Sequence, residues 1–567
     1  MLSRRAMAAC LLLGLVLALP ALAAPLAFDD LFHVAVLEGK APASLRWWEL
    51  FTFAPAEPGR HELFLAGGVL PWWSAPDLKI AFLRPLSSAL VALDHRLFGR
   101  WAPGWHLHSL LWWLAALAAV ARLYRRLLPA GLALLALVLF TLDDAHWMPI
   151  VWPAARNGLV SLCFGVLGLG AHLRWREQGW RAGAAHGPLC FAVGLCAGEV
   201  ALAVLAYVVA YEWVGRDGRG RLRALLAHGL VLVVYAFVRA RAGAGVAGSA
   251  SYVDPIHEPL RFAREAAGRV PALIADAVFG VPAELWGLEA RARVALVVAG
   301  LLAALLVGLW LRRALAALPP EEARPVRWLG LGALLALGPG AGALIGERIL
   351  LPSSVGAAVL FAVLLRDGVR RWRARRRPAT ALLLLAVGLP NLVLAGPLLL
   401  GKQYFWKRSA DSLHRGLCRA PLEGPRGRAL VIWADRWTPV LFGGLARQLQ
   451  CPGVTKSWTL ISVSPHRQAL TRASARALVL AADAPLLDTE WELGFRAPGH
   501  PLRVGDAVTQ QGGLTVTVAE VRDGRPTRVE LRLPRSLEES EYRLLVWRKG
   551  GLEPLPLAPG ESVSFGR

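Results

Sequence analysis

The residues best placed to do chemistry are two adjacent carboxylates, Asp29 and Asp30, which directly follow the first apolar segment of the chain. A carboxylate at a membrane boundary costs free energy unless it is solvated, paired with a cation or used in a reaction. The same group can serve as a general base when it lies within hydrogen-bond distance of a reacting hydroxyl. The pair opens segment 25–103, which is rich in tryptophan and histidine. This pattern points to an enzyme whose chemistry takes place at one face of a membrane.

Three further polar groups lie at the edges of apolar segments. They are the Asp143-Asp144 pair with His146, Glu199 between two short apolar segments, and the Glu347-Arg348 pair just before the sequence LPSS. Any one of them, taken alone, is equally well explained as a solvated loop residue. Four such groups that fall on the same side under a single topology indicate a shared function.

The composition identifies the class of protein in which these groups must be positioned. The chain has 567 residues, 56% of them hydrophobic, a mean hydropathy of +0.46 and a formal charge of +23. Long apolar segments of this kind are typical of a membrane protein. In a soluble protein the charge would suggest nucleic-acid binding. Here most of the arginine lies in short clusters between apolar segments, so membrane topology explains the charge and no nucleic-acid partner is expected.

The apolar segments predict about eleven membrane spans, although several are shorter than the ~20 residues of a simple span. The predicted spans are 7–24, 104–122, 127–142, 156–173, 187–198, 200–214, 222–239, 293–311, 328–345, 353–366 and 378–400. Segment 1–24 is either this first span, acting as a signal anchor, or a cleaved signal peptide. In both cases Asp29 lies on the non-cytoplasmic side.

Clusters of arginine fall on alternate loops, as in the run from Arg366 to Arg377. Because cytoplasmic loops carry an excess of Lys and Arg, one topology places these clusters in the cytoplasm. It leaves three long segments outside, which are 25–103, 240–292 and 402–567. We therefore expect a multi-pass protein of a bacterial inner (cytoplasmic) membrane. Its multi-span core is 104–401, and its acidic first loop and C-terminal domain face the periplasm.

The C-terminal segment 402–567 has lower hydropathy and predicts a soluble domain of mixed α/β, β-rich structure. Alternating apolar residues on both sides of Asp523-Gly524 predict a β-hairpin, namely Leu514, Val516 and Val518 before the turn and Val529, Leu531 and Leu533 after it. The sequence ALVIW at 429–433, followed by LFGGLARQL, predicts a strand–helix unit. Cys418 and Cys451 are either a disulfide, as expected on an oxidising side, or two free buried thiols.

The order of the polar motifs resembles that of the polytopic GT-C glycosyltransferases, in particular the protein O-mannosyltransferase-like branch (glycosyltransferase family 39). The resemblance covers roughly 25–370. Its motifs here are FDD ending at Asp30, FLRPLSS with Arg84, GWHLHSLL from Gly104, DDAHWMPIVWPAARN with His146 and Arg156, CAGEVAL with Glu199, and ERILLPSS with Glu347 and Arg348. Gly198 and Ile349 stand where the family has a lysine and an aromatic residue, and no tetratricopeptide repeats follow.

The resemblance implies a GT-C-like helical bundle that transfers a sugar, with inversion, from a polyprenyl-phosphate donor to a protein, lipid or polysaccharide acceptor. In that reaction Asp29 or Asp30 would be the general base. The leaving phosphate needs fixed positive charge, and an arginine fork matches its geometry. Arg348 is the first candidate, and Arg84 and Arg156 are the next.

The resemblance also implies that three more residues contribute to substrate or lipid-phosphate binding: Glu199, His146 and Glu347. The structural alternative for Arg348 is an ion pair with Glu347 or Glu199. No spacing of His, Cys or carboxylates is a metal signature, so no metal ligands are assigned. A divalent cation (Mg or Mn) stays open as a cofactor, because the second carboxylate of the Asp29-Asp30 pair could bind one.

Two other functions compete with the glycosyltransferase. One is a catalytically inactive GT-C relative that acts as a cell-envelope scaffold, and the other is a membrane transporter. A transporter would be expected to keep its essential charges near the middle of the membrane. Here the charges lie mainly at one edge of the predicted spans, which favours the enzyme.

Overall fold

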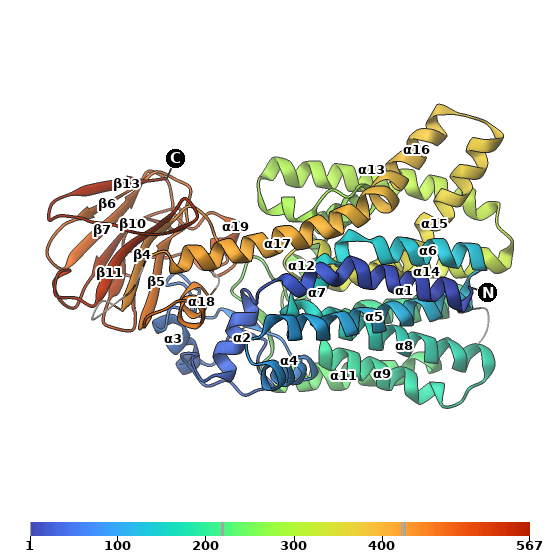
Figure 1. The fold of residues 1–567 in the computed structure, drawn as a ribbon, viewed down its shortest axis with the longest axis horizontal. Helices are drawn as coiled ribbons and strands as arrows, with labels where there is room; N and C mark the ends of the chain where they lie inside the picture. Colours follow the sequence, from blue (N-terminus) through green and yellow to red (C-terminus); the bar gives the residue numbers. More distant parts are fainter. Residues whose placement is uncertain (1, 217–219, 421, 423–426, 441, 567) are drawn as a thin grey trace. The chain divides into compact units, whose positions relative to one another are not determined.

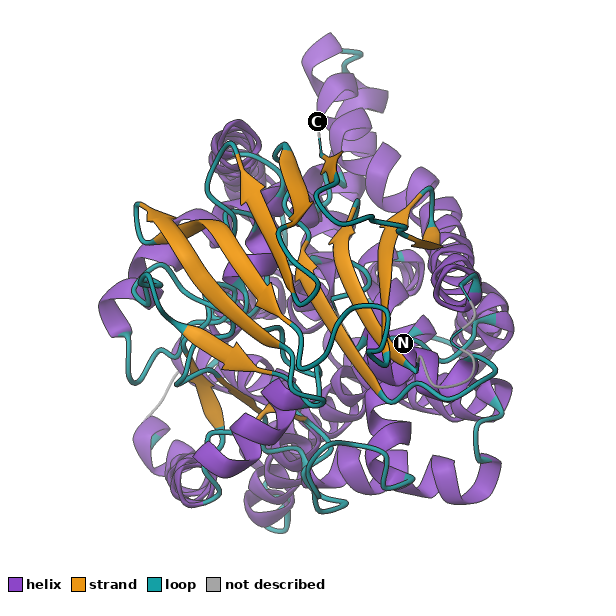
Figure 2. Ribbon diagram, turned by 90° about the vertical axis from the view of Figure 1, so that its left-hand side faces the viewer, coloured by secondary structure: helices purple, strands orange, loops and turns teal. Residues whose placement is uncertain are grey.

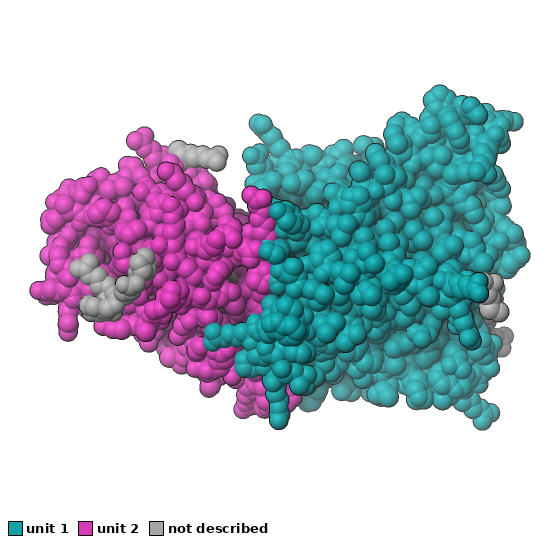
Figure 3. Space-filling view, viewed as in Figure 1, with its two compact units in different colours: residues 1–24, 83–242, 254–407 teal, residues 25–82, 243–253, 408–567 magenta. Residues whose placement is uncertain are grey.

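The computed structural model describes the whole chain except residues 1, 217–219, 421, 423–426, 441 and 567. It divides into two compact units, which Figure 3 distinguishes by colour. Unit 1 consists of Met1–Ala24, Leu83–Ala242 and Asp254–Lys407. Unit 2 consists of Pro25–Phe82, Gly243–Val253 and Arg408–Arg567.

Unit 1 is helical throughout its described part except for its connecting loops (Figure 1). Its longer helices are α1 (Arg4–Ala18), α4 (Pro85–Phe98), α5 (Ala102–Leu127), α6 (Ala130–Leu142), α8 (Asn157–Gln178), α9 (Gly183–Ala197), α10 (Val200–Ala210), α11 (Arg221–Arg241), α12 (Pro259–Phe279), α13 (Ala290–Ala316), α14 (Pro320–Gly340), α15 (Leu350–Ala374), α16 (Pro378–Gly388) and α17 (Ala395–Cys418). Short helical turns between them include η2 (Asp144–His146), α7 (Trp147–Val151), η3 (Pro153–Arg156), η5 (Ala283–Gly287) and η6 (Glu347–Ile349).

Among the described residues, seven helical segments are long and apolar enough to cross a membrane. They are Arg4–Ala23, Ala102–Leu127, Pro153–Gln178, Arg221–Arg241, Ala290–Ala316, Glu347–Ala374 and Pro378–Cys418. An eighth would be the pair Ala130–Leu142 and Asp144–Val151, which bends by 47° at Asp143. The short predicted spans 187–198 and 200–214 coincide with shorter apolar helices, Gly183–Ala197 and Val200–Gly215. The predicted total of about eleven stays a prediction.

The surface of these helices explains why they need a lipid environment. Large apolar side chains on α11 and α13 point away from the protein, with Leu222 72% exposed, Leu230 65% and Leu301 57%. In water such continuous apolar faces would be costly, whereas lipid chains cover them at no loss. The chain is therefore a multi-pass membrane protein. By contrast, α15 is the most buried of the candidate spans and forms the centre of the bundle.

The start of α15 is fixed by a tyrosine from α10. The hydroxyl of Tyr207 donates to the backbone carbonyl groups of Pro352 and Ser353, at 2.8 and 3.1 Å, and accepts the N–H of Gly356 at 3.0 Å. Gly356 in turn packs against the backbone of Leu329 on α14, where a Cβ atom would collide with the carbonyl oxygen. These contacts hold the turn η6, directly before α15, in a defined place within unit 1.

Unit 2 contains three β-sheets (Figure 2). A three-stranded antiparallel sheet joins β1 (Thr52–Ala54), β2 (Lys79–Ala81) and β3 (Gly245–Ala247). A four-stranded sheet has the order β12-β11-β4-β5, with β4 (Arg428–Ala434), β5 (Ser457–Ser462), β11 (Tyr542–Arg548) and β12 (Gly551–Pro554). A six-stranded sheet has the order β13-β6-β7-β10-β9-β8, with β6 (Gln468–Arg472), β7 (Ala477–Ala482), β8 (Ala507–Thr509), β9 (Thr515–Arg522), β10 (Arg525–Arg532) and β13 (Ser562–Phe565). The unit also contains α2 (Asp29–Leu37), α3 (Pro58–Ala66), α18 (Gly443–Gln450) and α19 (Glu490–Leu493).

Several local predictions for the C-terminal segment are confirmed. Strands β9 and β10 form the predicted hairpin, and both turn residues, Asp523 and Gly524, have positive φ, at 54° and 72°. Positive φ at both central positions is what a two-residue turn with the right twist requires. The predicted strand–helix unit is β4 followed by α18; its residue Leu441 lies outside the described residues. Cys418 and Cys451 form a disulfide.

The predicted segment boundaries differ from the units in two places. The sheet of β1, β2 and β3 brings 25–82 and 243–253 into unit 2, whereas 83–103, with α4, belongs to unit 1. The predicted domain start at 402 falls inside α17, which continues to Cys418. The apolar run ends at Lys402, but no proline or glycine interrupts 402–415, so the helix continues past the end of the hydropathy signal.

Candidate functional site

The acidic pair forms the first turn of α2 in unit 2. Asp30 is fully buried, and its Oδ2 accepts the backbone N–H of Ala27 at 3.1 Å. Asp29 is only half-buried. A carboxylate in the first helical turn is favoured by the exposed N–H groups and the dipole of the helix. Asp30 therefore closes the turn that begins the helix, and Asp29 is the more exposed carboxylate of the pair.

Aromatic side chains of unit 2 lie beside this turn. Phe28, with a positive φ of 51°, stacks on Trp437 at a centroid distance of 5.9 Å. Trp437 stacks on Trp491 at 3.7 Å with nearly parallel rings. Both tryptophans are half-buried. Aromatic faces of this kind bind the apolar faces of flat or ring-shaped ligands, so the neighbourhood of Asp29 is suited to a ring-shaped molecule.

Unit 1 holds a group of charged residues that we call the polar centre, composed of Asp144, Asp276, Glu284, Glu347 and Lys402. The ammonium Nζ of Lys402 lies 2.6 Å from Oδ2 of Asp144 and 2.5 and 2.6 Å from the two carboxylate oxygens of Glu347. The indole N–H of Trp147 donates to the same Glu347 carboxylate at 2.8 Å. One lysine thus joins the predicted Asp143-Asp144 and Glu347-Arg348 motifs, which are about 200 residues apart in the sequence.

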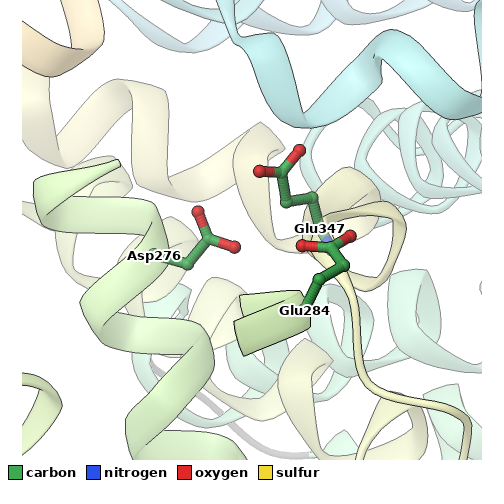
Figure 4. Close-up of side chains that lie close together, drawn as sticks. All are labelled: Asp276, Glu284 and Glu347. Carbon is green, nitrogen blue, oxygen red and sulfur yellow. The ribbon is translucent and has the colours of Figure 1, made fainter. Parts of the chain in front are cut away.

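Three carboxylates of the polar centre point toward one another (Figure 4). Asp276, Glu284 and Glu347 each offer an oxygen, and these oxygens all lie within 4.8 Å of one another. Backbone N–H groups fix two of them: Ala283 donates to Asp276 at 2.9 Å, and Glu347 itself donates to Glu284 at 3.0 Å. Burial, and then the charge of Glu347, hold the pKa of Asp276 well above its usual value.

The donor set of these three carboxylates fits a hard divalent cation. Mg²⁺ and Mn²⁺ prefer carboxylate oxygen, and three converging carboxylates would also gain from the added positive charge. The groups that would hold it in unit 1 are Asp276, Glu284 and Glu347. Cation binding by the Asp29-Asp30 pair stays a prediction. The raised pKa of Asp276 favours its protonated form when no cation is bound. A cation bound to the three carboxylates would displace that proton.

Arg348 follows Glu347 in the turn η6 and is half-exposed. Its guanidinium group contacts the sulfur of Met148 at 3.9 Å and the carbonyl oxygen of Leu344 at 3.5 Å. Both are weak acceptor contacts at these distances. Within the described part of the chain, no carboxylate forms an ion pair with Arg348, because Glu347 is bound to Lys402 and Glu199 to Arg84. The predicted structural alternative, a pair with either glutamate, is therefore not formed.

Arg84 and Glu199 form an ion pair in unit 1, with nitrogen–oxygen distances of 2.7 and 2.8 Å. Arg84 caps the start of α4, and Glu199 lies at the break between α9 and α10. Nearby, the hydroxyl of Ser87 donates to the carbonyl of Ala197 at 2.7 Å. The pair attaches α4 to this helix break and leaves Arg84 partly neutralised.

The remaining two predicted residues are buried inside unit 1. The guanidinium of Arg156 donates to the carboxylate of Asp94 and to the carbonyl of Trp105. Asp94 also contacts His108, at 2.6 Å. The Nε2 of His146 lies 2.9 Å from the hydroxyl of Ser354. These contacts join helices of the bundle, and a substrate-binding role for either residue stays a prediction.

Sequence reasoning missed Lys402, Asp276 and Glu284. A signal existed for Lys402, since it is the first charged residue after the uncharged run 378–401. A lysine there is usually an interfacial residue that extends toward water, and nothing local distinguishes the two cases. Asp276 and Glu284 lie in the predicted outside segment 240–292, and only the folding of α12 and η5 brings them to Glu347.

Comparisons with known proteins give likenesses of fold. No family model and no curated protein sequence matches the chain. It is similar to a crystal structure of the Archaeoglobus fulgidus oligosaccharyltransferase tethered with an acceptor peptide, at a TM-score of 0.42 and 10% identity, over 81% of this chain and 64% of that one. It is also similar to ArnT from Cupriavidus metallidurans bound to undecaprenyl phosphate, at a TM-score of 0.39 and 14% identity, over 79% and 84% of the two chains.

A third similar structure is the arabinofuranosyltransferase AftD from Mycobacteria, at a TM-score of 0.35 and 16% identity, over 94% of this chain and 40% of that one. The chain thus spans less than two thirds of the length of the oligosaccharyltransferase and of AftD. These likenesses concern the fold alone.

Proposed function

We propose that the protein is a membrane glycosyltransferase of GT-C type that transfers a sugar from a polyprenyl-phosphate donor to a protein, lipid or polysaccharide acceptor. The observation that carries the proposal is the half-exposed Arg348, which has no carboxylate partner among the described residues although four carboxylates lie in the adjacent polar centre. A guanidinium group kept free of carboxylates is suited to a phosphate, which it can bind through two parallel N–H donors.

The reaction makes one bond and breaks one. The acceptor hydroxyl oxygen attacks the anomeric carbon of the donor sugar, and the bond from that carbon to the lipid phosphate oxygen breaks on the opposite face, which inverts the anomeric centre. The hydroxyl proton passes to a general base, and the electron pair of the broken bond stays on the phosphate. Arg348 would stabilise the charge that develops on this phosphate, because a fixed donor acts most strongly where charge appears in the transition state.

For the general base, the motif order assigns Asp29 or Asp30. Within unit 2, Asp29 is the better candidate, because Asp30 is buried and one of its oxygens accepts a backbone N–H. The stacked rings of Phe28, Trp437 and Trp491 beside it support a ring-shaped acceptor or donor group. A catalytic base must lie within hydrogen-bond reach of the hydroxyl it deprotonates.

The Cys418–Cys451 disulfide supports a periplasmic position for the C-terminal domain. Disulfides persist in the bacterial periplasm and are rare in the cytoplasm. This agrees with the arginine clusters, which place the opposite loops in the cytoplasm. The active face would then be the periplasmic face of a bacterial inner membrane, where the long apolar chain of the donor lies among the membrane lipids.

A divalent cation at Asp276, Glu284 and Glu347 is a proposal that accompanies this function. It would supply positive charge next to Arg348, in addition to that of Lys402. Isothermal calorimetry with Mn²⁺ or Mg²⁺ on the purified protein tests it without an activity assay. Binding that is lost in Glu284→Gln supports the site, and equal binding by that variant and the unchanged protein contradicts it.

The test of the proposed function is mass spectrometry of envelope glycans from a deletion strain. The strain is complemented with the unchanged gene, Asp29→Asn or Asp30→Asn, and protein levels are compared. We expect a sugar modification to disappear on deletion and to return only with the unchanged gene, and Asp29→Asn to reach normal protein levels. Glu530→Gln, an exposed carboxylate change on β10 of the same unit, is the matched control and should restore the modification.

Three results would contradict the proposal in different ways. If both aspartate variants restore a normal glycan profile, the acidic pair is not catalytic, and an envelope scaffold explains the protein better. If deletion changes no glycan and instead blocks accumulation of a solute, the protein is a transporter. If the purified protein does not bind a polyprenyl phosphate, the donor assignment is wrong.

A further inference from the structure

Lys402 has an unusual set of partners for a lysine at the end of an apolar run. Such lysines commonly extend along the apolar surface toward interfacial water. Lys402 instead directs its Nζ at three carboxylate oxygens, one of Asp144 and two of Glu347, at 2.5–2.6 Å. An ammonium group has three N–H donors, so these two residues account for all of them.

Helix α17 also holds the Glu347 carboxylate indirectly, through the contact between Trp406 and Trp147. Trp406 follows Lys402 by one helical turn, and its ring lies 5.8 Å from that of Trp147. Trp147 donates its indole N–H to the Oε2 of Glu347 at 2.8 Å. The Glu347 side chain, 3% exposed, is therefore fixed by α17 both directly and through Trp147.

This arrangement decides what Arg348 can bind. A free carboxylate next to Arg348 would be its nearest counter-ion, and a guanidinium group neutralised in this way loses most of its attraction for a phosphate. Because Lys402 and Trp147 hold the Glu347 carboxylate, the contacts of the Arg348 guanidinium group with described residues are those with Met148 and Leu344.

We propose that Lys402 is a positioning residue whose ion pair with Glu347 keeps Arg348 available for the phosphate of the lipid donor. The inference rests on the proposed function. Lys402 does not itself bind the phosphate, because its three donors are already used within the protein. Removing the lysine frees the Glu347 carboxylate to pair with Arg348, and removing that carboxylate as well makes Arg348 available again.

The experiment measures the affinity of the purified full-length protein for undecaprenyl phosphate in lipid nanodiscs. The variants are Lys402→Met, Glu347→Gln, the double variant of both, and Arg348→Gln. Arg408→Gln is the matched control, since it removes an exposed positive charge from the same helix. Thermal unfolding of each variant is recorded to confirm that it is folded.

We expect Lys402→Met to weaken binding by about tenfold to a hundredfold, the range associated with one lost charge-assisted hydrogen bond. The double variant should return to within about threefold of Glu347→Gln alone. This recovery separates the proposal from a purely structural role, in which a second substitution in the same buried pair would restore nothing. Arg408→Gln should bind like the unchanged protein.

Two results would overturn the inference: unchanged binding in a folded Lys402→Met variant, or a double variant as weak as the single one. The double variant leaves no buried Glu347 charge without a partner, so it remains informative if Lys402→Met does not fold. Lost binding in the double variant would mean that Lys402 contacts the phosphate itself. Failure of the proposed function is distinct, because the unchanged protein would then not bind undecaprenyl phosphate at all.

Discussion

Two arginines of unit 1, Arg156 and Arg348, look equivalent in the sequence and differ completely in their surroundings. Both follow a polar motif at the start of a predicted span, and both were candidates for the lipid phosphate. Arg156 is buried and paired with Asp94, whereas Arg348 is half-exposed beside a carboxylate that Lys402 holds. The counter-ion of a charged residue, rather than the type of residue, decides whether it stabilises the fold or is left to bind a ligand.

The same contrast exists between carboxylates. Asp254, which precedes α12, is buried but is bound by Arg239 at 3.0 Å and by the N–H of Ile256 at 2.9 Å. Glu492 in α19 of unit 2 is also buried, but among the described residues its hydrogen-bond donors are the uncharged groups of Thr489 and the backbone of Leu487. The first carboxylate has a cation as its partner and the second has none, so their pKa values shift in opposite directions.

The largest expected effect concerns Arg156. Arg156→Gln leaves the carboxylate of Asp94 buried without its cation, and breaking such a pair typically costs about 3–5 kcal/mol. We expect a strongly lowered thermal midpoint for the purified variant, and partial recovery when Asp94→Asn is added. Arg313→Gln, an exposed arginine on α13, is the control. A thermal midpoint for Arg156→Gln equal to that of the control would remove the distinction between the two arginines.

The next effect concerns Arg348, where we expect a change in ligand binding and not in thermal stability. Arg348→Gln should weaken binding of undecaprenyl phosphate by about tenfold to a hundredfold, as expected for one charge-assisted hydrogen-bonded group. Its thermal midpoint should stay close to that of the unchanged protein, because Arg348 forms no ion pair with any residue that the structure describes. Binding and unfolding are measured on the same preparation. A variant that unfolds early and binds normally would assign Arg348 to the fold.

Because of Glu492, we expect the free energy of unfolding to depend on pH. Burial raises the pKa of Glu492 from 4.5 to about 6, despite the opposing hydrogen bonds from Thr489. Because the folded-state pKa is the higher one, the stabilisation is complete below pH 4.5 and is lost as the pH rises through about 6. The loss should be about 2 kcal/mol, from a shift of about 1.5 pKa units. Glu492→Gln should remove it, as measured by the thermal midpoint relative to the unchanged protein at pH 4.5 and 7. An identical pH profile for both would contradict the assignment.

Asp254 should show the smallest effect, with the reverse sign. Burial acts to raise the pKa of Asp254, but the N–H of Ile256 and the guanidinium of Arg239 outweigh it and hold the pKa below its usual value of 3.8. Its stabilisation is therefore present above pH 3.8 and is lost as the pH falls through the lowered pKa. Asp254→Asn should destabilise the protein by about 1 kcal/mol at pH 7, the typical net value of one hydrogen-bonded pair. The difference in the free energy of unfolding between Asp254→Asn and the unchanged protein should vanish at acidic pH. A difference that stays constant with pH would show that the charge of Asp254 is not involved.

Much of the fold could be predicted from local patterns. Each of the eleven predicted spans overlaps one described helix or a run of consecutive helical segments. Uninterrupted apolar runs leave the backbone no other way to satisfy its hydrogen bonds in lipid. The hairpin at Asp523-Gly524 and the strand–helix unit after 428 were equally local. The disulfide was one of two open alternatives. The end of α17 was not predicted. The apolar run ends before Lys402, whereas the helix continues to Cys418.

The candidate site was only partly predictable. Sequence motifs located Asp29, Asp30, Glu199, Glu347 and Arg348 at the edges of apolar segments, since charges are costly inside them. They did not indicate that Asp30 closes its own turn, that Arg84 pairs with Glu199, or that Arg156 and His146 are buried. Each of these facts depends on a partner elsewhere in the chain, and a motif contains no information about such partners.

Hydropathy and local hydrogen bonding act over a few residues, so the amino-acid order is enough to identify a membrane protein, the approximate positions of its helices and the charged residues at their ends. Which charges neutralise one another follows from the packing of the helices in space. Lys402 reaches Asp144 and Glu347 across separations of 258 and 55 residues. Electrostatic pairing depends on distance in space, and this distance is set by the packing of whole helices.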